Sequence, residues 1–194
     1  GKGKSTPAPE SSLQESLQRE LEQEANRIRM VLQNNLTLKD LVDQISVEVT
    51  DEGIRLEFRD APRFSFFDIG SAVVKPELER SLEILAPEIA RLGYPVVIEG
   101  HTDSRPYGTT TYSNWELSAD RASAVRRVLI AKGLEPTKVT EVRSYADTRL
   151  LKPEDPLAAE NRRVSILLKR SLSAGKPLTG IQKEVIQPPI ILKP

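Results

Sequence analysis

The sequence predicts a two-layer α/β (α+β) sandwich, in which helices in a β-α-β-α-β order cover one side of a mixed β-sheet. Three observations predict this fold. Apolar and polar residues alternate on both sides of a turn within residues 47–58, and leucines recur at helical spacing over residues 78–92. A buried strand at residues 96–100 then leads into a capped helix. A long amphipathic helix is expected before the sandwich.

The N-terminal segment is predicted to be a helix that follows a short disordered start. Residues 1–10 hold almost nothing to bury, so we expect them to be disordered. From Ser12, which can form a capping box with Glu15, leucine and isoleucine recur at helical spacing to about Gln33. Two interpretations stay open: the helix packs on its own domain, or it meets a partner chain or moves between a membrane and the domain. A short helix should follow.

A hairpin, an apolar loop and a second helix come next. The alternating apolar residues of the hairpin are Val47, Val49, Ile54, Leu56 and Phe58. The loop of residues 64–72 is rich in phenylalanine, and we expect Phe66 and Phe67 to fill the core. Pro76 suits a first helical position, and the helix that it opens should end at Gly93.

A strand, a polar loop and a third helix follow. The apolar run of residues 96–100 indicates a buried strand. Ser113 and Glu116 have the spacing of a capping box, so the helix should begin at Asn114. Gly133 should end it.

Arg121 lies inside the apolar stripe of this third helix. The stripe consists of Leu117, Val125, Val128 and Leu129, with Ala124 at its margin. A buried guanidinium needs an anionic partner, because burying a lone charge costs several kcal/mol, roughly. Asp103, which follows Thr102 after the preceding strand, is the nearest candidate. Either the two charges pair, or both face a ligand that carries both signs of charge.

The C-terminal part holds two more strands. Residues 139–145 should form one, and the segment Asn161-Arg162-Arg163 opens the other, in which apolar residues alternate. Neighbouring side chains of a strand face opposite ways, so only one of Arg162 and Arg163 should reach a site at this end. Residues 171–194 should form a flexible tail, although docking onto the domain or a partner stays open.

Composition excludes several functions. Lys+Arg and Asp+Glu are both 28, so no net charge draws the chain to nucleic acid. The absence of cysteine excludes thiolate metal sites and cysteine nucleophiles, and one histidine argues against a histidine metal site, so no cofactor or metal is expected. No apolar run approaches the roughly 18 residues of a spanning helix.

Three motifs in order carry a family resemblance. Residues 100–103 (GHTD), 114–122 (NWELSADRA) and 161–163 (NRR) look like the OmpA-like peptidoglycan-binding domain, over about residues 45–170. The long loop before Asn-Trp-Glu-Leu-Ser is similar to the MotB family of flagellar stator subunits in particular. The resemblance implies a domain plan of a disordered start (1–10), a helical regulatory segment (11–44), the binding domain (45–170) and a tail (171–194).

The resemblance also implies a site for diaminopimelate, a zwitterionic residue of peptidoglycan stem peptides. Asp103 would accept hydrogen bonds from its ammonium, while Arg121 would clamp its carboxylate. The remaining expected peptidoglycan-binding residues are Thr102, Asn114, Leu117, Arg162, Arg163 and Asp68.

The function expected from the resemblance is non-catalytic: anchoring a stator to the cell wall, with the N-terminal segment regulating activation. The expected partners are peptidoglycan, a second copy of the chain, and a MotA-type channel subunit reached through a membrane helix that is not in this chain. The chain would then be the periplasmic part of an inner-membrane protein. The alternative is an OmpA- or Pal-like wall tether without motor function. A wall hydrolase using His101, Asp103 and a serine is disfavoured, because the sequence has no nucleophile elbow.

Overall fold

The computed structural model describes residues 9–107 and 111–170 of the chain. Its elements, in order, are α1 (Pro9–Asn34), η1 (Leu36–Gln44), β1 (Ile45–Thr50), β2 (Gly53–Arg59), α2 (Pro76–Leu92), β3 (Val96–His101), α3 (Asn114–Ala131), η2 (Pro136–Lys138), β4 (Val139–Ser144), η3 (Ala159–Asn161) and β5 (Arg163–Lys169). Here η marks a 3₁₀-helix. Helix α1 begins before the expected start at Ser12, and the short helix after it is η1. The expectations for residues 1–8 and 171–194 lie outside the described residues.

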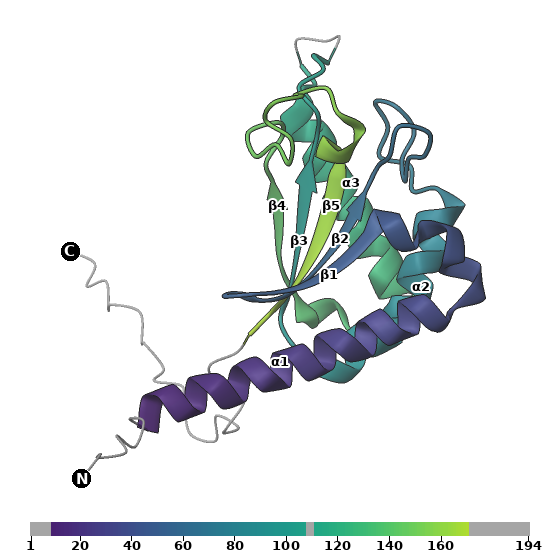
Figure 1. Ribbon diagram of the computed structural model, residues 1–194. Helices are drawn as coiled ribbons and strands as arrows, with labels where there is room; N and C mark the ends of the chain where they lie inside the picture. The colour runs from purple at the N-terminus through teal and green to yellow at the C-terminus, as the bar shows by residue number, and fades with distance from the viewer. Residues whose placement is uncertain (1–8, 108–110, 171–194) are drawn as a thin grey trace, which may run out of the picture.

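The five strands form one mixed sheet in the order β1-β2-β5-β3-β4 (Figure 1). Strands β1 and β2 form the predicted antiparallel hairpin, and β5 pairs antiparallel with both β2 and β3. Only β3 and β4 are parallel. The predicted α+β sandwich is therefore confirmed, and β5, the last of the described strands, lies at the centre of the sheet.

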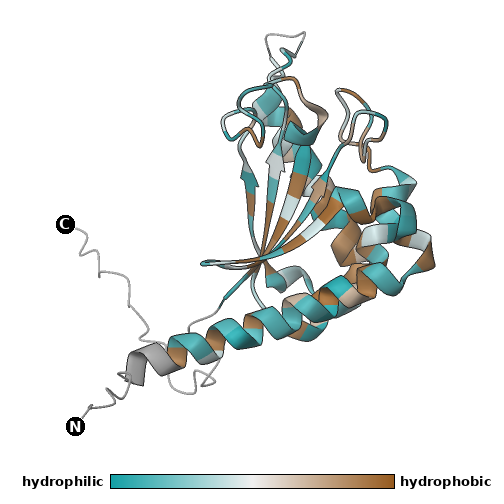
Figure 2. Cartoon of the chain, in the orientation of Figure 1, coloured by the Kyte–Doolittle hydropathy of each residue, from teal (hydrophilic) through white to brown (hydrophobic). Residues whose placement is uncertain are grey.

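Apolar side chains fill the space between the sheet and the helices. The core includes the inward-facing residues of β2, β3 and β5, and the buried stripe of α2 (Leu78, Leu82, Leu85 and Ile89). Figure 2 shows hydrophobic residues along these strands, between polar ones. Phe66 and Phe67 are buried in the same core, as expected. Gly93 ends α2 in the left-handed conformation, with φ 67°.

The second half of α1 packs on the domain. Its residues at helical spacing (Leu21, Ala25, Ile28 and Leu32) are buried within the core. Arg29 of α1 donates two hydrogen bonds to the carbonyl oxygen of Val47, at 3.0 and 2.8 Å, and Arg27 pairs with Glu88 of α2. Leu13, near the start of the helix, is exposed. Of the two interpretations of this helix, the first is therefore correct for residues 21–32, which pack on their own domain. None of the helices within residues 9–107 and 111–170 is long and apolar enough to cross a membrane.

Helix α3 approaches β3 very closely. The capping box of Ser113 and Glu116 starts this helix, as the sequence predicted. A Cβ placed on Gly100 of β3 would lie 2.0 Å from the carbonyl oxygen of Ser118 in α3, so only glycine fits there. The close contact fixes the first turns of α3 at the end of the sheet where β2, β3 and β4 finish and β5 begins.

Candidate functional site

Three loops meet at this end of the sheet, away from α1 (Figure 1). They connect β2 to α2, β3 to α3, and β4 to β5. A cavity of about 200 Å³ opens among them. Its lining residues are Ile69, Gly70, Thr102, Asp103, Arg105, Pro106, Tyr107, Asn114, Leu117, Arg121 and Arg162. Six of the eight residues expected to bind peptidoglycan therefore line one cavity, called here the Asp103 pocket; Asp68 and Arg163 do not.

Arg121 is almost fully buried, with 2% of its surface exposed. Its Nε donates to the carbonyl oxygen of Ser71 at 2.9 Å, and its Nη2 donates to that of Asp68 at 3.1 Å. The guanidinium also lies over the ring of Phe67, 5.0 Å from the ring centroid. Its Nη1 makes no hydrogen bond with any described residue and is not among the fully buried polar atoms, so it reaches the solvent. Arg121 thus holds the loop after β2 and keeps one donor available.

Asp103 pairs with Arg162 and not with Arg121. Its Oδ2 accepts a hydrogen bond from Arg162 Nη1 at 2.7 Å, and its Oδ1 accepts from the backbone N–H of Arg105 at 3.2 Å. Direct pairing of Asp103 with Arg121, one of the two alternatives, does not occur. The other alternative remains, because both side chains line the same pocket.

Asp60 is the residue that the sequence interpretation missed. It follows the end of β2 and is 5% exposed, and its carboxylate accepts from Arg162 Nε and from the backbone N–H of Phe66, both at 2.9 Å. Burial raises the pKa of Asp60, and these hydrogen bonds oppose the rise. The sequence feature that could have identified Asp60 is its position just after a strand, which resembles the position of Asp103 after β3.

The two arginines are like charges held close together. Burial lowers the pKa of Arg121, and the nearby charge of Arg162 lowers it further, against the attraction of Asp60 and Asp103. Burial also acts to lower the pKa of Arg162. Its hydrogen bonds to Asp103 and Asp60 have the larger combined effect, so the pKa of Arg162 is raised. Both guanidinium groups remain charged. An anion entering the pocket would relieve their repulsion.

The two remaining expected site residues lie elsewhere. Arg163 is on the opposite face of the sheet, where its Nε pairs with Glu57 at 3.2 Å; of the two neighbouring arginines, Arg162 alone lines the pocket. The Asp68 carboxylate is 67% exposed and pairs with Lys75 at 3.3 Å. Its contribution to the Asp103 pocket is its backbone carbonyl, which holds Arg121.

Polar groups around Asp103 shape the pocket wall. Asn114 donates through Nδ2 to the carbonyl oxygens of Asp103 and Arg105, at 3.3 and 3.1 Å. Tyr107 donates to the carbonyl oxygen of Gly70 at 2.5 Å, which joins two of the loops. Thr102 is 2% exposed, and its Oγ1 has no hydrogen-bond partner among the described residues.

His101 points away from this pocket. Its ring stacks on Tyr145, with the ring centroids 5.1 Å apart. Burial, together with the charges of Arg163, Arg55 and Arg149, lowers the pKa of His101 to about 3, so the ring is neutral near pH 7. In the part of the chain that the structure describes, no group of three or more His, Cys, Asp or Glu side chains could hold a metal ion.

The mixed sheet and the pocket at its loop end define the class of this domain. The model of the OmpA family matches residues 66–163, and the chain belongs to that family. Within it, the chain is similar to Motility protein B of Escherichia coli K12, with 31% identity over 91% of this chain and 63% of the relative. The Peptidoglycan-associated lipoprotein of Pseudomonas aeruginosa is 38% identical over 52% of this chain and 59% of the relative. The chain therefore spans less than two thirds of the length of either relative.

A solved structure has the same fold over about two thirds of this chain. It is the periplasmic domain of Helicobacter pylori MotB, which matches with a TM-score of 0.56 and 27% identity, over 64% of this chain and 78% of that chain. The expected resemblance to the OmpA and MotB families is thus confirmed.

Proposed function

We propose that this chain binds diaminopimelate-type peptidoglycan in the Asp103 pocket and so anchors a flagellar stator of the MotB type to the cell wall. Two relatives support the proposal: one is a motility protein, and the other is named for its association with peptidoglycan. We further propose that the domain works in the periplasm, as the solved MotB domain is named for doing, and that it is part of an inner-membrane protein.

The observation that carries the proposal is the arrangement of charges around the pocket. A buried guanidinium with one unused donor, Arg121, shares the cavity with a carboxylate, Asp103. The free end of diaminopimelate carries an ammonium and a carboxylate on one carbon atom. Arg121 Nη1 donates to the ligand carboxylate, and Asp103, whose oxygens have lone pairs left, accepts from the ammonium. Leu117 and Ile69 contact the methylene chain.

The site binds and does not catalyse. A general base must be within hydrogen-bond reach of the substrate, and His101, the histidine that a hydrolase would use, is buried outside the pocket. The proposed role needs no cofactor.

Binding is tested by isothermal titration with L-Ala-γ-D-Glu-meso-diaminopimelate and with the same tripeptide carrying L-lysine in the third position. Lysine lacks the second carboxylate, so it should bind at least tenfold more weakly, as expected for loss of a charge-assisted hydrogen bond of about 1.5–3 kcal/mol. Equal affinity for the two peptides would rule out the role given to Arg121.

Variants test the same residues on intact peptidoglycan. Asp103→Asn and Arg121→Lys should reduce co-sedimentation with purified sacculi, whereas Arg127→Gln, which removes an exposed charge on the same helix, should not. Circular dichroism checks that each variant is folded. If folded Asp103→Asn sediments like the unmodified chain, the pocket is not the wall-binding site.

The stator role includes partners and regulation. The proposed assembly is a homodimer beside a MotA-type channel subunit, which it reaches through a membrane helix not in this chain. The segment of residues 11–44 regulates activation. To test this role, the chain is joined to the membrane helix of a host strain's stator protein and expressed in that strain after its own stator protein has been deleted. Restored swimming would support the stator role.

The alternative is an OmpA- or Pal-like wall tether without motor function, and the similarity to the lipoprotein favours it. Sacculus binding without any restoration of swimming would support the tether.

A further inference from the structure

A second cavity of about 380 Å³ adjoins the Asp103 pocket. Its lining residues are Asp60, Ala61, Pro62, Arg63, Phe64, Ser65, Phe67, Ile69, Lys75, Glu77, Arg121 and Arg162. Three of these, Ile69, Arg121 and Arg162, also line the Asp103 pocket. The two arginines therefore form a wall that two neighbouring cavities share.

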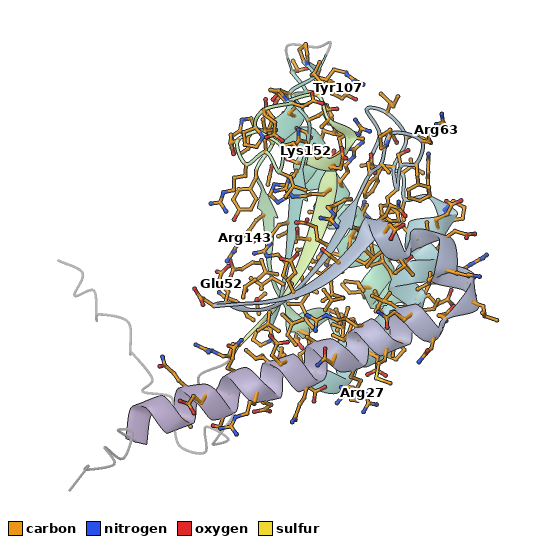
Figure 3. The ribbon with its side chains drawn as sticks, viewed as in Figure 1. Arg27, Glu52, Arg63, Tyr107, Arg143 and Lys152 are labelled. Atoms are coloured by element: carbon orange, nitrogen blue, oxygen red, sulfur yellow. The ribbon has the colours of Figure 1, made fainter. Side chains whose placement is uncertain are left out.

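Cationic side chains outnumber carboxylates in the lining of this second cavity, called here the Arg63 cavity. Four cationic side chains line it (Arg63, Lys75, Arg121 and Arg162), against two carboxylates (Asp60 and Glu77). Asp60 is already paired with Arg162 at 2.9 Å, and Lys75 is paired with Asp68 at 3.3 Å, so Arg63 and Arg121 are the two lining cations without a carboxylate partner among the described residues. Arg63 makes no ion pair with any residue of the described ranges, and it lies on the loop between β2 and α2 (Figure 3). The cavity is thus suited to an anion.

The shared wall also has hydrogen-bond donors to offer. Arg162 uses Nε for Asp60 and Nη1 for Asp103, and its Nη2 makes no hydrogen bond within residues 9–107 and 111–170. Arg121 likewise has an unused Nη1. Neither nitrogen is among the fully buried polar atoms, so both are open to a ligand. Two guanidinium groups with one open donor each can bind two carboxylates, one on each side of the wall.

We propose that the Arg63 cavity binds the α-carboxylate of the D-glutamate that precedes diaminopimelate in the stem peptide. This inference depends on the proposed function. The D-glutamate is linked through its γ-carboxyl group, so its α-carboxylate is ionised and close in sequence to the diaminopimelate zwitterion. Arg162 Nη2 and Arg63 bind this carboxylate, while the zwitterion occupies the Asp103 pocket. The chain thus recognises two consecutive residues of the stem.

The test compares the same tripeptide with an analogue in which only the α-carboxylate of D-glutamate is amidated. Amidation removes the charge and leaves the zwitterion intact, so titration should show about five- to tenfold weaker binding, as for a charge-assisted contact in a partly open cavity. In Arg63→Gln this difference between the two peptides should shrink to about two- to threefold, because Arg162 Nη2 still contacts the carboxylate. Arg127→Gln, a matched exposed arginine on α3, should keep the full difference.

The outcomes separate this inference from the proposed function. If both peptides bind the unmodified chain equally, the α-carboxylate site is refuted and the diaminopimelate pocket stands. If the amidation effect persists unchanged in Arg63→Gln, the Arg63 cavity is not where the carboxylate binds. If neither peptide binds, the proposed function and this inference fail together.

Discussion

Replacing Gly100 by alanine should damage both the fold and the pocket. The added Cβ would lie 2.0 Å from the carbonyl oxygen of Ser118 and 2.7 Å from its carbonyl carbon. Ordinary van der Waals contact begins at 3.4 Å, so α3 would have to move away from β3 by about 1 Å or more. Because the obstacle is backbone, no change of rotamer removes it.

The expected loss of stability is about 3 kcal/mol, at the upper end of the cost of overpacking a core. A shift of α3 also disturbs the Ser118 hydroxyl, which accepts from the backbone N–H of Ala146 at 3.1 Å and lies 2.6 Å from Ser144 Oγ. Arg121 follows Ser118 by one turn, and its hydrogen bonds of 2.9 and 3.1 Å to the loop would stretch beyond reach. Affinity for the tripeptide should therefore fall with stability.

Urea unfolding followed by the fluorescence of Trp115, the single tryptophan, measures the change. Gly133→Ala is the control, because Gly133 has φ +103° and no atom within 4 Å of an added Cβ, so only backbone strain of about 1–2 kcal/mol applies. If Gly100→Ala costs no more than the control and binds the tripeptide normally, the reasoning from the close approach is refuted.

Three further predictions follow from other contacts. In the folded chain the pKa of His101 is lowered to about 3, so between about pH 6.5 and pH 3 the unfolded chain binds a proton that the folded chain does not. The free energy of unfolding should therefore fall as the pH falls through this range, by up to about 1.4 kcal/mol per pH unit. Urea unfolding at several pH values measures this slope, which should be smaller in His101→Phe. Arg162→Gln should weaken tripeptide binding about tenfold or more in calorimetry, whereas Arg163→Gln, which faces Glu57, should leave affinity unchanged. Ala146 has φ 46°, a left-handed conformation that strains alanine and suits glycine, so Ala146→Gly should raise the free energy of unfolding by up to about 1 kcal/mol. A lower free energy of unfolding in urea would contradict this prediction.

Local pattern was enough for the elements of the fold. The capping box before α3 and the leucine stripe of α2 each concern residues within a few positions, and both predictions were confirmed. The sheet order was not predictable in the same way. Strand β5 lies between β2 and β3, and this pairing depends on contacts between segments separated by more than 50 residues.

The site shows the same division. The sequence placed Arg121 on a buried helix face and named Asp103 as its nearest candidate partner, and both residues line the Asp103 pocket. The partners of Arg121 were not predictable, because this side chain is held by backbone carbonyl oxygens, which every residue carries. Asp60 was missed because its partner, Arg162, is 102 residues away.

The packing of α1 has a mechanical consequence. Figure 1 shows α1 at one end of the sheet and, at the other, the loops whose residues line the Asp103 pocket. A pulling force applied between the start of α1 and a ligand in that pocket must therefore be transmitted through the whole domain. It reaches the domain first at the four α1 residues that pack on the core: Leu21, Ala25, Ile28 and Leu32. Under the proposed anchoring function, the largest force that the chain can bear would depend on the packing of these four residues as well as on the affinity for the ligand.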